Sequence, residues 1–202
     1  MKKIITIGRE FGSGGHEIAE QLSKRLNYAL FDKEIVDAAA KKSGIKAKEF
    51  QRYDEKAMNS LLYSLVIGNY YREAENGAIE HPIAMRVEQA YFATIISLAE
   101  KEPCVIVGRG ADYILRENVN RISFFITAKE KDRVARIQNK YDVSEAEAVK
   151  MIEKNDRNRS AYYKNVTGQT WGMAENYDFC ICRSYYGIET TVAIIHKLIQ
   201  SS

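Results

Sequence analysis

The chain has 202 residues, of which 46% are hydrophobic and 28% are charged, and its formal net charge is +3. These proportions are typical of a single globular domain and exclude disordered and fibrous proteins. The charge excess is small and mixed along the chain, so it indicates neither a nucleic-acid polymer nor a membrane surface as a partner.

The start of the chain and its cysteines indicate the compartment. The opening MKKIITIG lacks the apolar segment of a signal peptide, and no apolar run approaches the roughly 20 residues of a membrane span. The three cysteines, Cys104, Cys180 and Cys182, form no CxxC pair and no metal-binding spacing. Cys180 and Cys182 alternate on a predicted strand, and we expect all three to pack in the core. A reducing, cytoplasmic setting is therefore predicted.

The first elements are a strand, a glycine loop and a helix. Residues 4–7 form a short β-rich run, and apolar residues between 18 and 26 recur at helical spacing. The glycine loop, residues 8–16, joins them. A second short strand is predicted over residues 28–31, and a helix begins with residues 35–40.

Residues 46–101 differ from the rest, because they show helical spacing and few strand signals. They are predicted to form long helices outside the sheet, as an insertion with a break at residues 77–82. Each side of the break has one apolar face: Met58, Leu61, Leu62 and Leu65 before it, and Val87, Tyr91, Ile95 and Leu98 after it. With the tyrosines here, this apolar surface exceeds what one helix needs, which predicts a homodimer.

The alternating pattern then returns. Strands are predicted at residues 103–107, 121–126 and 177–182, and an amphipathic helix over residues 192–199. Two charged helices are expected to begin at capping boxes, one formed by Thr127 and Glu130 and one by Ser144 and Glu147. Alternating strands and helices predict a three-layer α/β/α fold with a parallel sheet.

The glycine loop lies where a strand leads into a helix, so its N–H groups and the helix N-terminus can bind an anion. A dinucleotide fingerprint fits at Gly12 and Gly14 but fails at Glu17. The pattern G-x-x-x-x-G-K-[ST] also fails, because Arg9 takes the place of its first glycine and Gly15 that of its lysine. A plain turn without a ligand is a third interpretation. The position of the loop favours a phosphate site.

Several segments, in order, resemble the cytidylate kinase-like family, a branch beside the true cytidylate kinases. The first is ITIGREFGSGGHEIAEQLSKRLNYALFDKEI, and the others are CVIVGRGADYIL, FFITAKEKDRVARI, VSEAEAVKMIEKNDRNRSAYYKNVTGQTWG and NYDFCICRSYYGIE. The resemblance covers most of the chain. It implies a P-loop kinase core, a helical insertion that binds a nucleoside monophosphate, and an arginine-bearing lid over residues 156–172. It also implies ATP and Mg²⁺ as cofactors, and phosphoryl transfer to a nucleotide such as CMP or dCMP.

The resemblance and the loop together give the candidate site residues. Phosphate binding is assigned to Arg9, Gly12, Ser13, Gly14, Gly15, His16 and Glu17. The resemblance implies that Asp32 and Arg109 bind the acceptor, and that the catalytic arginines are Arg133, Arg157 and Arg159. Arginine suits these roles because it binds phosphate oxygens bidentately and phosphoryl transfer depends on positioning and charge neutralisation. The lid has few large aliphatic residues, which predicts that it is mobile.

Three positions depart from the pattern of true cytidylate kinases. Gly15 replaces the loop lysine, Gly110 replaces an acid, and Cys182 replaces the acid that reads the base. Arg9 is the local candidate to replace the lysine, unless it points to solvent or pairs with a loop glutamate. Possible substitutes for the metal-organising acid are Glu10, Glu17 and Asp112. Two other functions remain open: a regulatory module that binds nucleotide or phosphate without catalysis, and a self-associating interaction protein.

Overall fold

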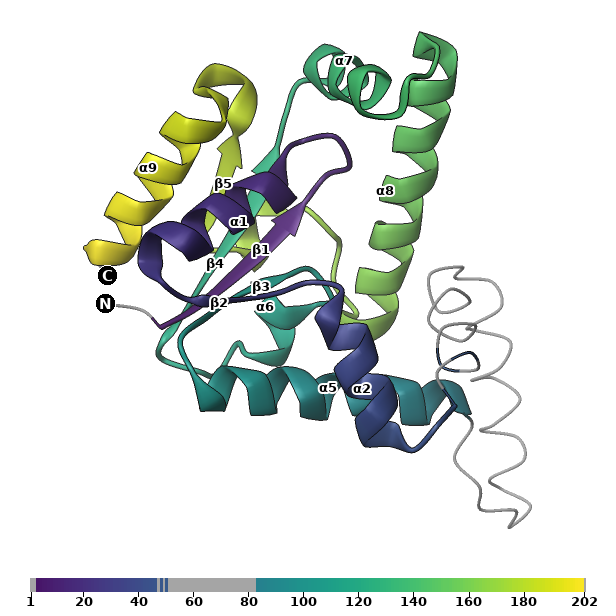
Figure 1. Ribbon diagram of the computed structural model, residues 1–202, viewed down its shortest axis with the longest axis vertical. Helices are drawn as coiled ribbons and strands as arrows, with labels where there is room; N and C mark the ends of the chain where they lie inside the picture. The colour runs from purple at the N-terminus through teal and green to yellow at the C-terminus, as the bar shows by residue number, and fades with distance from the viewer. Residues whose placement is uncertain (1–2, 47, 49, 51–82, 202) are drawn as a thin grey trace.

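The computed structural model describes residues 3–46, 48, 50 and 83–201 (Figure 1). Element labels follow Figure 1. The strands are β1 (Ile4–Arg9), β2 (Ala29–Phe31), β3 (Cys104–Val107), β4 (Arg121–Thr127) and β5 (Phe179–Cys182). The helices are α1 (Gly15–Leu26), α2 (Glu34–Ser43), α5 (Ile83–Lys101), α6 (Ala111–Ile114), α7 (Glu130–Tyr141), α8 (Glu145–Thr167) and α9 (Gly187–Gln200). Two short 3-10 helices are η1 (Ala174–Asn176) and η2 (Arg183–Tyr185).

The five strands form one sheet in the order β2-β3-β1-β4-β5, and every neighbouring pair is parallel. This confirms the predicted parallel sheet. β1 is the central strand, so the loop that follows it opens at the middle of the sheet's C-terminal edge. Ligands in open parallel sheets bind at this edge.

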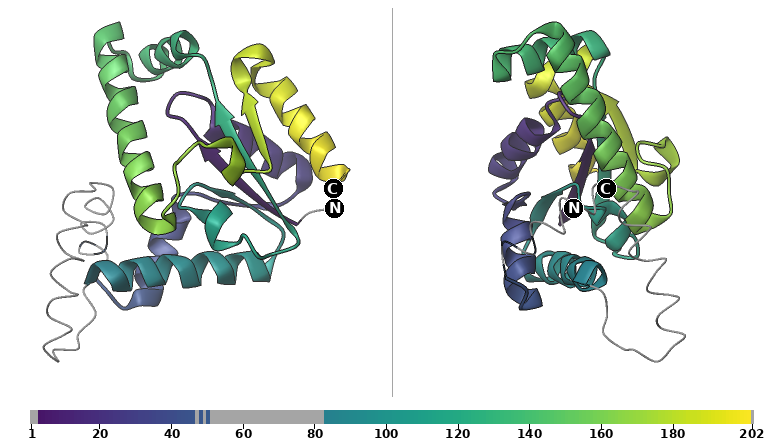
Figure 2. Two further views of the ribbon diagram at one scale, coloured as in Figure 1. Left: turned by 180° about the vertical axis from the view of Figure 1, so that it is seen from behind. Right: turned by 90° about the vertical axis from the view of Figure 1, so that its right-hand side faces the viewer.

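Helices α1 and α9 cover one face of the sheet (Figures 1 and 2). Ile18 and Leu22 of α1 and Ile195 of α9 are fully buried against Ile5 and Ile7 of β1. Side chains alternate across a strand, so these two isoleucines share a face. Each fully buried side chain of this size contributes roughly 1.5–3 kcal/mol, and the predicted helical spacing places them together.

Helices α2, α5 and α6 form the core cluster on the opposite face with β1 and β3. Val87, Tyr91 and Ile95 are buried there, as their spacing predicts. α5 therefore packs against the sheet, and the assignment of residues 46–101 to an insertion stays a prediction. Residues 51–82 lie outside the described part of the chain. The apolar residues of positions 58–65, the predicted break and the homodimer through this segment therefore stay predictions.

The two predicted capping boxes have different outcomes. Ser144 caps α8: its hydroxyl accepts a hydrogen bond from the Glu147 N–H (3.3 Å), and the Glu147 carboxylate accepts one from the Ser144 N–H (3.0 Å). The box at Thr127 is wrong. Thr127 is the last residue of β4 and pairs with β5, while α7 begins after Lys129 without a side-chain cap. Strand pairing holds the threonine away from the helix start.

The cysteines divide by face. Cys104 is buried on β3, but Cys180 is exposed and Cys182 is partly exposed, so core packing was wrong for this pair. β5 is an edge strand, and it directs Phe179 and Ile181 toward α9. The alternating cysteines therefore face the other side.

Across the described ranges, no helix combines the length and apolar character that a membrane crossing needs.

Candidate functional site

The glycine loop turns tightly between β1 and α1. Gly12 and Gly14 both have a φ of 82°, a left-handed conformation that residues with a Cβ rarely adopt. The Ser13 hydroxyl donates to the Glu10 carbonyl (2.9 Å) and accepts from the Gly15 N–H (3.3 Å). These bonds fix the turn that leads into α1, whose first-turn N–H groups have no partner within the helix. The local structure therefore suits an anion.

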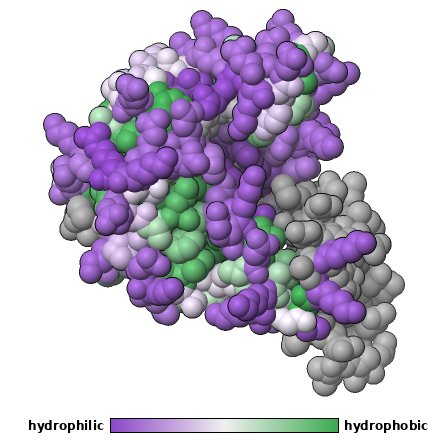
Figure 3. Space-filling view, in the orientation of Figure 1, coloured by the Kyte–Doolittle hydropathy of each residue, from purple (hydrophilic) through white to green (hydrophobic). Residues whose placement is uncertain are grey.

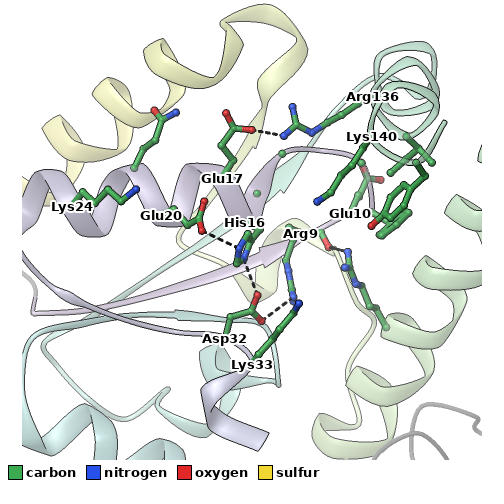
Figure 4. A pocket seen from close by; sticks show the side chains of 18 residues that line it. Arg9, Glu10, His16, Glu17, Glu20, Lys24, Asp32, Lys33, Arg136 and Lys140 are labelled. Carbon is green, nitrogen blue, oxygen red and sulfur yellow. Dashed lines mark hydrogen bonds and ion pairs between the residues drawn. The ribbon is translucent and has the colours of Figure 1, made fainter.

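A cleft of about 680 Å³ lies over this loop, between α1 and the pair α7 and α8. Hydrophilic side chains surround the hollow (Figure 3). Figure 4 shows basic and acidic side chains that converge on it from α1, α7 and the end of β2. The basic lining residues are Arg9, Lys24, Lys33, Arg136, Lys140 and Arg159, and the acidic ones are Glu10, Glu17, Glu20 and Asp32. The surplus of cations favours an anionic ligand.

A smaller lobe of about 150 Å³ opens beside this cleft, at the C-terminal ends of β1 and β3. Its lining includes four aromatic residues, Tyr162, Tyr163, Trp171 and Tyr177. Arg9, Asp32 and Arg159 line both spaces. The two lobes therefore meet at these three charged side chains.

Arg9 lies between two glycines at this junction. A Cβ on Gly15 would be 2.5 Å from the Arg9 Cβ, and a Cβ on Gly108 would be 2.0 Å from Arg9 Nη1. The side chain is 18% exposed, and its Nη2 lies 3.5 Å from Asp32 Oδ1. Arg9 therefore neither points to solvent nor pairs with a glutamate of the loop. Burial, with Arg159 next in effect, lowers the pKa of Arg9 to about 9, so the side chain stays cationic at neutral pH.

Asp32 and His16 form a pair across the junction. His16 Nδ1 lies 2.8 Å from Asp32 Oδ2, and His16 Nε2 lies 3.4 Å from Glu20 Oε1. Asp32 does not cap α2, whose N-cap is Lys33 without a side-chain bond. The structure thus brings Asp32 beside the first turn of α1, and its predicted contact with the monophosphate substrate stays a prediction.

The three candidate catalytic arginines have different positions. Arg159 lines both lobes, donates to the Arg9 carbonyl (2.9 Å) and lies 5.5 Å from the Phe11 ring centroid. Arg157 is exposed and lines neither lobe. Arg133 is 8% exposed and also lines neither. Of the three arginines, the structure brings only Arg159 into the cleft.

The predicted lid begins inside α8, which continues to Thr167. Tyr163 and Thr167 are buried, so the expectation that little burial holds this segment was wrong at both. Tyr163 Oη donates to Asp112 Oδ2 at 2.7 Å. The mobility of residues 156–172 stays a prediction.

Arg109 and Asp112 belong to the smaller lobe. Arg109 has a φ of 58°, and its guanidinium lies 5.0 Å from the Tyr91 ring centroid and 5.9 Å from that of Tyr162. These are cation–π distances, which hold the guanidinium in place. Asp112 is 6% exposed, and burial raises the pKa of its carboxyl.

Sequence reasoning missed two sets of lining residues. No sequence pattern indicated the aromatic residues of the smaller lobe. They come together only because residues 162–177 pack against Phe125 of β4 in the folded chain. Arg136 and Lys140 had a usable signal, since a spacing of four residues puts them on one helix face. Arg136 pairs closely with Glu17 across the mouth of the cleft (Figure 4).

The proposed metal-organising acids already have partners. Glu10 accepts from the Ala128 N–H (3.1 Å) and contacts Arg133, Glu17 pairs with Arg136, and Asp112 accepts from Tyr163. Burial also raises the pKa of Glu10. Within the residues that the structure describes, no three His, Cys, Asp or Glu side chains are grouped to hold a metal. A magnesium ion that arrives with nucleotide phosphates needs only one or two carboxylates, and Glu17 and Asp32 line the cleft.

Comparisons with known proteins agree with this geometry. A comparison with curated proteins found no match. One match is the crystal structure of a protein from Eubacterium ventriosum that is described as uncharacterized. Its sequence is 31% identical to this chain and its TM-score is 0.73, and the match covers 98% of this chain and 99% of that one.

Two shikimate kinase structures show the fold alone, at 12% identity and a TM-score of 0.51 each. The match to the enzyme from Bacteroides thetaiotaomicron covers 98% of both chains. The match to the enzyme from Acinetobacter baumannii, in complex with shikimate, covers 100% of this chain and 94% of that one. The P-loop kinase fold is therefore confirmed. The model of the cytidylate kinase-like family matches residues 4–185, and the chain belongs to that family.

Proposed function

We propose that this protein transfers a phosphoryl group from ATP to a nucleoside monophosphate, such as CMP or dCMP, or to a similar small acceptor. The observation that carries the proposal is the junction of the two lobes. A cationic cleft over the glycine loop and a smaller aromatic lobe share Arg9, Asp32 and Arg159. Two substrates bound side by side would meet at these residues.

The donor phosphates would bind the loop and the start of α1, where free N–H groups and the helix dipole favour negative charge. Arg9 supplies the cation that the missing lysine would otherwise supply. Its guanidinium reaches the junction from β1 because Gly15 and Gly108 leave room for it. Arg136 would exchange its contact with Glu17 for one with a phosphate oxygen.

Transfer itself depends on alignment and on neutralising the charge of the phosphoryl oxygens. Arg159 faces both lobes and is held against the Arg9 carbonyl. This position suits a group that contacts the phosphoryl group during transfer. Arg109 lies on the acceptor side, where a phosphate or another anionic group would bind it.

Magnesium bound to the donor would neutralise phosphate charge. Glu17 and Asp32 are the carboxylates of the cleft that could help to hold it. Asp32, held by His16, also lies where it would orient an acceptor group toward the donor.

The test is turnover of ATP with a panel of acceptors: CMP, dCMP, the other nucleoside monophosphates and shikimate, with and without Mg²⁺. Transfer to one of them supports the proposal. Binding of ATP by calorimetry without turnover on any acceptor would instead identify a regulatory binding module, which Gly15 and Gly110 favour. If ATP does not bind at all, the kinase proposal is wrong and self-association becomes the better hypothesis.

A further inference from the structure

Arg133 is placed to shape the phosphate loop and not to contact phosphate. Its Nε donates to the Phe11 carbonyl (2.8 Å), Nη1 lies 3.3 Å from Glu10 Oε1, and Nη2 bonds closely to Asp156. Each of its three nitrogens therefore has a protein partner. Arg133 also lines neither lobe of the site.

Asp156 completes the arrangement from α8. Its Oδ1 accepts from the Phe11 N–H at 2.7 Å, while its Oδ2 binds Arg133. The backbone of Phe11 is thus held at both its N–H and its carbonyl by two charged side chains from different helices. Charge-assisted bonds of this kind are about twice as strong as neutral ones.

The next residue depends on the same contact. Gly12 crosses the backbone of α7 so closely that a Cβ would be 3.0 Å from the Arg133 carbonyl oxygen. The Phe11 side chain packs into the cluster of Val134, Ile137, Ala148 and Ile152 between α7 and α8. The outer half of the loop therefore takes its shape from these helices.

We infer that Arg133 and Asp156 form a loop clamp: two positioning residues that hold residues 10–12 so that the N–H groups of the glycine loop converge on the donor phosphates. This inference rests on the proposed function for its ligand. It assigns Arg133 an effect on phosphate binding that passes through the backbone of Phe11.

Neutralising Asp156 separates this role from direct phosphate contact by the sign of the effect. If Arg133 bound phosphate, Asp156→Asn would release its guanidinium and remove a negative charge, and anion binding would strengthen. A loop clamp predicts the opposite, because the shape of the loop is lost. We expect Asp156→Asn and Arg133→Lys to weaken binding of inorganic tripolyphosphate and of ATP by roughly tenfold, the effect of about 1.4 kcal/mol.

Glu153→Gln is the matched control, because it makes the same charge change on an exposed position of α8 three residues away. It should leave affinity unchanged or slightly higher. Melting curves verify that each variant is folded, and both test substitutions are conservative enough to keep the helices. Tighter binding by Asp156→Asn would overturn the inference.

A second readout needs no ligand. The Phe11 amide hydrogen should exchange roughly tenfold faster in Asp156→Asn and in Arg133→Lys than in wild type, the same factor as for binding. Exchange of the amides of β1 should stay unchanged. Unchanged exchange at Phe11 would also overturn the inference. Faster exchange in a protein that binds neither tripolyphosphate nor ATP would support the clamp and contradict only the proposed function.

Discussion

At the scale of single residues, the Arg9 side chain occupies the space that any side chain at position 15 would need. The two Cβ atoms would be 2.5 Å apart, which no real pair of side chains tolerates. In the pattern G-x-x-x-x-G-K-[ST], position 9 is the first glycine and position 15 is the lysine. The two departures from that pattern are therefore linked, because a side chain at position 15 has no room beside Arg9.

We expect Arg9→Ala to weaken ATP binding by about 1.5–3 kcal/mol, because one charge-assisted contact is lost. Gly15→Lys should also weaken it, since the new side chain displaces Arg9. The double substitution Arg9→Gly with Gly15→Lys should recover most of the affinity, because the glycine leaves room for the lysine. The measurement is calorimetric titration at fixed salt.

Arg25→Ala is the control for the loss of charge, since Arg25 is exposed on α1 and lines neither lobe. Equal affinities of Arg9→Ala and wild type would show that Arg9 is not the cation that replaces the lysine. A double variant weaker than both single variants would contradict the shared space.

Asp112 gives stability a pH dependence. Burial raises its pKa in the folded protein, so the folded state binds the proton more tightly than the unfolded state does. The free energy of unfolding therefore falls as pH rises from the ordinary value of an aspartate to this raised value. Asp112→Asn still offers an oxygen to Tyr163 and removes the dependence.

Within that pH window, the stability advantage of Asp112→Asn over wild type should grow by about 1.4 kcal/mol for each pH unit, and it should vanish at lower pH. Urea titrations across the acid range measure it. Asp142→Asn is the control, because Asp142 is exposed and its left-handed conformation also suits asparagine. A pH-independent difference would show that the Asp112 carboxyl does not titrate abnormally.

At the scale of elements, the two predicted capping boxes have the same sequence pattern, but only the box at Ser144 forms. The difference should appear in the stability of the two matching alanine variants. Ser144→Ala should destabilise the protein by about 1 kcal/mol, the usual effect of losing an N-cap. Thr127→Ala should change stability by less than about 0.5 kcal/mol, because Thr127 caps nothing. Thermal or urea unfolding of both variants tests the pair. Equal losses would mean that the two helix starts are held alike.

The elements themselves were largely predictable because their spacing is strong. Among the described residues, apolar runs predicted each strand to within one or two residues. The faces of α1, α5 and α9 followed from the positions of Ile18, Ile95 and Ile195. The sequence could not show that α5 belongs to the core, because helical spacing gives a face and not the partner of that face. For the same reason, Cys180 and Cys182 were placed in the core although β5 lies at an edge.

At the scale of the whole molecule, the cleft lies between the glycine loop and the pair α7 and α8, so a ligand there should stabilise all three. ATP at about one hundred times its dissociation constant should raise the free energy of unfolding by about 2.7 kcal/mol. Hydrogen exchange over residues 156–172 should slow on addition of ATP with Mg²⁺. Exchange there as slow as in β1, and unaffected by nucleotide, would contradict a lid that closes on the ligand.

The candidate site was predictable in its centre and not at its borders. The strand, glycine loop and helix order located Gly12 to His16, and the resemblance located Asp32, Arg109 and Arg159. Burial decided the rest: Arg133 faces inward to Phe11, while Arg157 faces solvent. The sequence does not distinguish the two arginines. The packing of α7 against α8 buries Arg133 and leaves Arg157 exposed.

The slot that Gly15 and Gly108 leave for Arg9 also restricts how such a chain can change in descent. A lineage that passes from the lysine arrangement to the arginine arrangement must alter positions 9 and 15. Either change alone leaves the loop with no cation or with two side chains in one volume. If Arg9 contacts phosphate as we propose, the passage crosses an intermediate that binds phosphate more weakly, unless both substitutions arise together. Once Arg9 is in place, the same barrier opposes reversal.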